Sequence, residues 1–166
     1  KIPVDIVHPS FDLSKYRILA APVAYLLQPG FAAKVEAFVQ AGGIFLTTFC
    51  SGLVDPTDQI MTGGYPAELG RVLGLWVEEF DALYPDMKNE IVLSQPLAGM
   101  TGAHACGLIC GVVRPEKAEV LGIYGKDYYA GKPALTRHQF GQGQAWYLAT
   151  DPEPDFLAKL LAHLCR

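Results

Sequence analysis

The sequence predicts an α/β fold: a mostly parallel β-sheet flanked by helices, with antiparallel strands toward the C-terminus. Two continuous apolar runs, 17–23 and 44–49, have the length of strands buried on both faces, as in parallel sheets. Between them, residues 29–41 carry apolar side chains at helical spacing, so strand, helix and strand form one βαβ unit. Beyond residue 105, short strand-like segments separated by glycine-rich turns indicate antiparallel pairing.

The first half of the chain contains two further signals. Residues 4–7 alternate weakly between apolar and polar side chains, which predicts a short strand. The helix predicted over 29–41 begins with Pro29, which suits a first turn, and stops at the glycine pair 42–43. Its apolar stripe consists of Phe31, Val35, Phe38 and Val39.

A long turn-rich loop, Cys50 to Pro66, follows the second buried run. It leaves the carboxyl end of a parallel strand, where open α/β sheets usually place their functional loops. A short helix over 67–73 and a strand over 75–80 come next. Residues 81–102 show no clear pattern.

The C-terminal part is predicted as four short strands and a last helix. Gly141 to Gly143 give a hairpin turn signal between the last two strands. Asp151 is predicted to cap the helix, with Pro152 at its first position. Without a repeat or a linker, we expect residues 1–166 to form a single domain with a flavodoxin-like sheet. The four strands are predicted over 105–113, 118–124, 133–140 and 144–149.

Composition places the chain among folded proteins and narrows its partners. Hydrophobic residues make up 51% and charged residues 18%, which excludes a disordered chain. The net charge of −4, without a Lys/Arg cluster, excludes a nucleic-acid partner. No apolar run spans a membrane, no signal-peptide core opens the chain, and the four cysteines lack CxxC spacing, so we expect a cytoplasmic protein. A mean hydropathy of +0.21 indicates apolar surface covered by a partner or a sheet covered on both faces.

Several short strings, taken in order from residue 12 to 150, resemble one protein family. The strings are DLSKY (12–16), APVAYLL (21–27), AGG (41–43), SGLVD (51–55), GGYP (63–66), LGLWVEEFD (73–81), ALTR (134–137) and FGQGQAWYLAT (140–150). Their co-occurrence at this spacing resembles the middle, trimerisation domain of glycoside hydrolase family 42 β-galactosidases.

The resemblance implies a fold related to class I glutamine amidotransferases and a non-catalytic role in assembling a homotrimer. It also implies a parent enzyme that is a retaining β-galactosidase acting on terminal β-D-galactosides, with the galactoside bound by a separate barrel domain. Two features depart from the family pattern. The strand and helix that normally precede the segment resembling 2–9 are absent, so we expect a domain lacking its first strand and helix. Cys50 stands where many members have an arginine before Ser-Gly.

The chain is too short to hold the catalytic barrel. A retaining glycosidase uses two carboxyl groups about 5–5.5 Å apart, and the family places both in a β/α barrel, a fold of about 250 residues. Glu79 and Asp81 share one face of a predicted strand at roughly 6.6 Å, but acidic residues of this kind, like neighbouring Glu78, usually form a solvated edge. We therefore predict no catalytic residues and an inactive fragment.

Two other functions stay open as alternatives. An amidotransferase-like hydrolase would use Cys50 as its nucleophile, because Cys50 follows a buried strand where such enzymes place theirs. The local string lacks the first glycine of the amidotransferase elbow, and the downstream histidines are His138 in a predicted strand and His163 in a predicted helix. A sugar-binding module would use the same loop with Trp76, although a lone tryptophan is more often core or interface.

No metal or cofactor is expected. His104, Cys106 and Cys110 suggest a metal site at first sight, but the two thiols would lie about 13 Å apart on a regular strand. Gly141 to Gly143 is not a phosphate loop, because neither Lys-Ser/Thr nor a helix follows it.

The loop Cys50 to Pro66 is the candidate contact region for assembly. Charged substitutions at Leu53 and Tyr65 are expected to weaken association of the full-length enzyme. The candidate interface residues are Ser51, Gly52, Leu53, Val54, Asp55, Tyr65 and Pro66.

Overall fold

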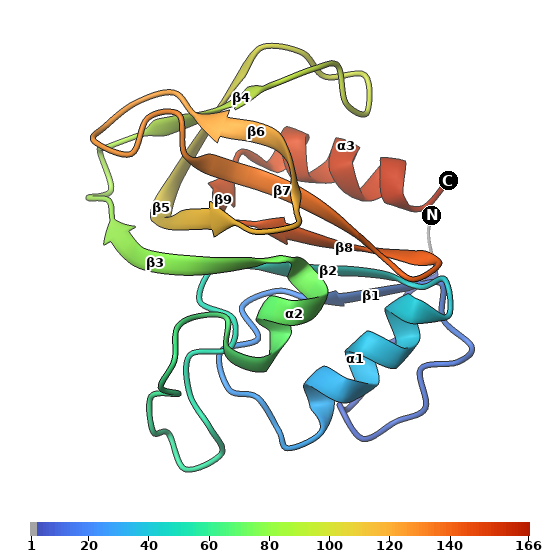
Figure 1. The fold of residues 1–166 in the computed structure, drawn as a ribbon. Coiled ribbons are helices and arrows are strands. Elements are labelled where there is room, and N and C mark those ends of the chain that lie inside the picture. The colour runs from blue at the N-terminus through green and yellow to red at the C-terminus, as the bar shows by residue number, and fades with distance from the viewer. Residues whose placement is uncertain (1–2) are drawn as a thin grey trace.

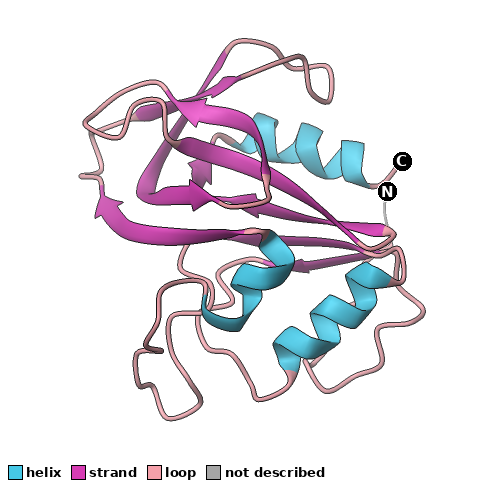
Figure 2. Cartoon of the chain, viewed as in Figure 1, coloured by secondary structure: helices cyan, strands magenta, loops and turns pink. Residues whose placement is uncertain are grey.

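The computed structural model describes residues 3–166 as one mixed sheet flanked by helices (Figures 1 and 2). The strands are β1 (Ile18–Ala21), β2 (Ile44–Thr48), β3 (Leu75–Ala82), β4 (Asn89–Leu93), β5 (Ala103–Pro115), β6 (Glu119–Tyr124), β7 (Pro133–Phe140), β8 (Gly143–Leu148) and β9 (Thr150–Pro152). The helices are α1 (Phe31–Gln40), α2 (Gly70–Leu73), which follows a 3₁₀ turn at Ala67–Leu69, and α3 (Pro154–Leu164). None of these helices is long and apolar enough to cross a membrane.

The parallel part of the sheet consists of β1, β2 and β8. The predicted βαβ unit is confirmed: β1 and β2 pair in parallel and α1 connects them. The expectation of a mostly parallel sheet is wrong, because only β1–β2 and β2–β8 are parallel among the described pairings, and six are antiparallel. From β3 onward the strands are joined by turns and loops without a crossover helix, and such connections favour antiparallel neighbours.

The antiparallel part curls back on itself. The sheet order is β1-β2-β8-β7-β6-β4-β5-β3, and β9, which directly follows β8, pairs with β5. At the junction, the Ala149 N–H donates to the Ala134 carbonyl at 2.9 Å and the Gly111 N–H donates to the Ala149 carbonyl at 2.7 Å. The buried Tyr124 hydroxyl donates to the same Ala149 carbonyl at 3.0 Å. The strands β8, β7, β6, β4, β5 and β9 therefore close on one another, and their buried side chains belong to the same apolar core as those of α1 and β2.

Helices cover both faces of the parallel part. α1 and α2 lie on one face and α3 on the other (Figure 1). Val35 and Val39 of α1 are completely buried, as the helical stripe predicts. On the opposite face Trp146 of β8 packs edge-on against His163 of α3, with ring centroids 6.3 Å apart. Because helices cover both faces of the sheet here, the side chains on both faces of β2 and β8 are mostly apolar.

The structure differs from the sequence analysis in four details. Residues 4–7 form no strand, and β1, predicted to be buried on both faces, is a half-exposed strand that pairs with one neighbour among the described residues. The segment 81–102, which showed no pattern, contains β4. The last helix begins at Pro154 after Glu153, because residues 150–152 are taken up as β9 by pairing with β5.

Candidate functional site at the carboxyl ends of β1 and β2

Two loops leave the carboxyl ends of neighbouring parallel strands and lie against each other. Residues 22–30 follow β1 and residues 50–66 follow β2 (Figure 1). Backbone hydrogen bonds join them: Gly52 N–H to the Ala24 carbonyl at 2.9 Å and Leu53 N–H to the Tyr25 carbonyl at 3.0 Å. In the opposite direction, the Leu27 N–H donates to the Val54 carbonyl at 3.1 Å. The pair behaves as one unit, although neither segment is a strand of the sheet.

A chain of hydroxyl groups fastens this unit to the sheet. The Thr47 hydroxyl donates to the Ala21 carbonyl at 2.8 Å. Because a threonine has one hydroxyl proton, the 2.7 Å contact between Thr47 and Ser51 must be a bond donated by Ser51. Ser51 Oγ in turn accepts the Ala24 N–H at 3.0 Å. Each group polarises the next, which favours a single arrangement of the loop base.

The outer part of the loop is shaped by an aspartate turn. Asp55 Oδ1 accepts from the Thr57 N–H and the Thr57 hydroxyl, both at 2.8 Å, and from the Gln59 N–H at 3.1 Å. The Thr57 hydroxyl and these amides lower the pKa of Asp55 below its ordinary value. The turn brings Ile60 back beside Val54, with which it forms an isolated bridge.

The end of the loop is packed against its beginning. Gly52 has φ +67°, and a Cβ at this position would collide with the Pro66 carbonyl. Tyr65 precedes a cis bond to Pro66, accepts the Val77 N–H at 2.6 Å and packs on Phe80 with ring centroids 5.7 Å apart. A glycine is therefore required where the two ends of the loop meet.

The predicted interface residues mostly build the loop. Ser51, Gly52, Val54 and Pro66 are buried within the domain, whereas Leu53, Asp55 and Tyr65 are half-buried. The exposed apolar side chains on the same unit form what we name the carboxyl-edge patch: Val23 (45% exposed), Tyr25 (44%), Leu26 (38%) and Ile60 (66%). Sequence reasoning missed these four residues, although three of them lie in the APVAYLL string.

Comparison with known proteins gives the family. The family model of the beta-galactosidase trimerisation domain matches residues 1–166. The chain belongs to this family.

Relatives and solved structures agree. The chain is 46% identical over 164 residues to the beta-galactosidase BgaP of Planococcus sp. (strain L4), covering 99% of the chain and 24% of that protein. The crystal structure of beta-galactosidase from Bacillus circulans sp. alkalophilus has a TM-score of 0.93 at 53% identity, covering 95% of this chain and 23% of that one. The beta-galactosidase from Rahnella sp. R3 has a TM-score of 0.95 at 37% identity, with 99% and 24% covered. The trimerisation domain thus spans about a quarter of the relatives that it matches.

Cys50 of the trimerisation domain has one feature of a nucleophile and lacks others. Its φ of +56° resembles a strained elbow after a strand. Burial, however, raises the pKa of its thiol, which opposes thiolate formation. His138 is paired with Ala145, and Ala145 is paired with Phe45 on the next strand. Because Phe45 lies five residues before Cys50, His138 and Cys50 are separated by roughly 16 Å along the strand direction. His138 Nδ1 also lies 2.8 Å from the Val72 carbonyl, which it engages instead.

The residues considered for sugar binding and hydrolysis are engaged elsewhere in the domain. The Trp76 ring lies under Gly64 and beneath the Arg114 guanidinium, 6.0 Å from the ring centroid. The Tyr128 hydroxyl donates to Glu79 at 3.1 Å and the Tyr129 hydroxyl to Asp81 at 3.0 Å. Lys132 pairs with Glu78 at 3.6 Å.

The spacing expected for Cys106 and Cys110 is wrong. Because of an irregularity in β5, Cys106 pairs with Pro152 and Cys110 pairs with Thr150. These two partners are only two residues apart on β9, so the two cysteines lie roughly 7 Å apart along the strand. Hydrogen bonding to the Cys110 thiol and burial raise the pKa of Cys106. His104 Nδ1 lies 3.2 Å from Glu153 Oε1. Among residues 3–166, no three His, Cys, Asp or Glu side chains are grouped as metal ligands.

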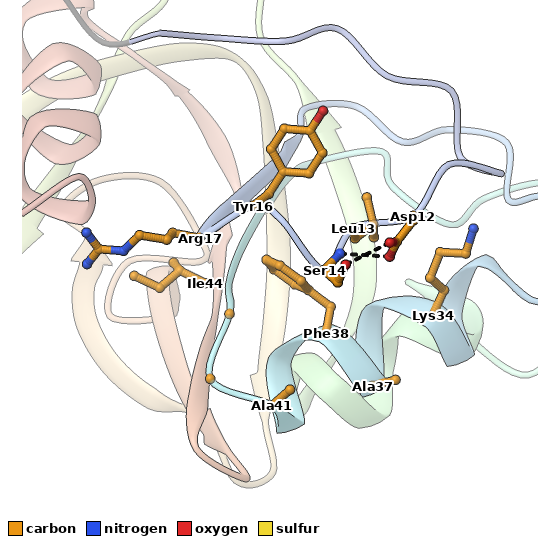
Figure 3. A pocket seen from close by; sticks show the side chains of 12 residues that line it. Asp12, Leu13, Ser14, Tyr16, Arg17, Lys34, Ala37, Phe38, Ala41 and Ile44 are labelled. Atoms are coloured by element: carbon orange, nitrogen blue, oxygen red, sulfur yellow. Dashed lines mark hydrogen bonds between the residues drawn. The ribbon is translucent and has the colours of Figure 1, made fainter.

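A hollow lies at the other end of the parallel strands. It has a volume of about 550 Å³ and lies between residues 12–17, α1 and the turn that leads into β2 (Figure 3). Asp12 is held there by Ser14, whose N–H and hydroxyl donate to its carboxylate at 2.9 and 2.7 Å. No candidate interface residue lines this hollow.

Proposed function

We propose that this chain is the trimerisation module of a β-galactosidase that hydrolyses terminal β-D-galactosides. In this proposal a barrel elsewhere in the parent enzyme binds the galactoside and supplies both catalytic carboxyl groups, and this chain contributes none. The support comes from the family to which the chain belongs and from relatives that are beta-galactosidases about four times its length.

The carboxyl-edge patch is the surface that we assign to the subunit contact. Four large apolar side chains, among them Tyr25 and Ile60, gather on loops that hydrogen bonds hold in one arrangement. Exposed apolar clusters of this kind commonly mark protein interfaces. A loop that is ordered before association also loses less conformational entropy when it binds. In this assignment the predicted residues Ser51, Gly52 and Val54 shape the loop, and the exposed side chains make the contact.

The test uses the full-length enzyme. The double substitution Leu26→Glu and Ile60→Glu should dissociate the trimer at micromolar concentration, measured as molar mass by light scattering. The matched control is Ala162→Glu, which adds a carboxylate to an exposed position of α3 and should leave the mass unchanged. A double variant that stays trimeric would rule out this patch as the subunit contact.

We also infer that the sheet is completed by one more parallel strand between residues 4–7 and β1, giving the flavodoxin-like, amidotransferase-related order. Two observations support this. β1 pairs only with β2 among the described strands, so one backbone edge is open. Val4 and Ile6, predicted as strand residues, are 79% and 100% exposed and lie without a neighbouring strand. An inserted strand would pair with both segments and give residues 4–7 the partner that a strand needs.

The cytoplasm is the compartment that we propose for the parent enzyme. Cys50, Cys106, Cys110 and Cys165 are all free thiols. Free thiols persist where glutathione and thioredoxin keep cysteines reduced, and such conditions are typical of the cytoplasm.

A further inference from the structure

We draw no further inference here: the strongest candidate, the buried thiol pair of Cys106 and Cys110 on β5, carries nothing, because their register with β9 sets the two cysteines roughly 7 Å apart along the strand, beyond the usual span of a disulfide, and no third His, Cys, Asp or Glu among residues 3–166 joins them in a group that could hold a metal ion.

Discussion

Replacing Ser51 by alanine removes the middle member of the hydroxyl chain that holds the 50–66 loop. Two hydrogen bonds are lost, the 2.7 Å bond to Thr47 and the 3.0 Å bond from the Ala24 N–H. Each is worth roughly 0.5–1.5 kcal/mol net, and the amide left without a partner adds to the cost. The free energy of opening the loop should therefore fall by about 1–3 kcal/mol, or roughly 5- to 150-fold in the opening equilibrium.

Hydrogen exchange measures this opening in the full-length enzyme. The amides of Ala24, Leu53 and Val54, which bond across the two segments, should exchange faster in Ser51→Ala by that factor. The control is Ser14→Ala, an exposed serine whose hydroxyl, within residues 3–166, bonds only to Asp12. Unchanged exchange at the Leu53 and Val54 amides would refute the claim that the hydroxyl chain holds the loop.

Two further predictions concern the loop. Gly52→Ala should lower the melting temperature more than Gly63→Ala: both have positive φ, which costs an alanine roughly 1–2 kcal/mol, but only Gly52 faces the Pro66 carbonyl. Equal melting temperatures would show that the backbone around Pro66 can move away from the new Cβ without loss of stability. Because burial raises the pKa of the Cys50 thiol above its ordinary 9.0, its alkylation at pH 8 should be slower than that of an unstructured peptide thiol and still rise beyond pH 9. A rate that levels off below pH 8 would indicate an activated cysteine, and Cys50→Ser should leave galactoside hydrolysis unchanged.

The elements predicted correctly are those whose signal is local. β2 carries a continuous apolar and β-branched run, α1 has a full apolar stripe with glycines after it, and the turn at 141–143 is marked by its own residues. β4 was missed because its five residues lie between irregular segments and depend on β5 and β6 for pairing. β9 was missed because Asp151 and Pro152 imitate a helix start, and only the approach of β5 makes them a strand.

The sequence predicts which loop forms the candidate site, but it does not predict which side chains of that loop are exposed. The carboxyl end of β2 follows from the βαβ pattern, and the structure places the 50–66 loop there. Which of its residues face outward depends on contacts from residues 22–27, which a pattern within the loop cannot reveal. The predicted strand at 4–7 failed for a similar reason, since a strand exists only with a neighbour.

The buried framework of the loop and its exposed patch should therefore act together in assembly. Ser51 is 1% exposed and cannot touch a neighbouring subunit. Yet its hydroxyl fixes the segment that carries Tyr25, and the Asp55 turn fixes the position of Ile60. If the framework is loosened, these segments must become ordered when the subunits associate, and the conformational entropy lost in that step weakens binding. Ser51→Ala should thus weaken the trimer in proportion to its loss of exchange protection, whereas Ser14→Ala should do neither. A trimer of unchanged stability in Ser51→Ala, with the loop clearly opened, would mean that the contact does not depend on the loop being held in advance.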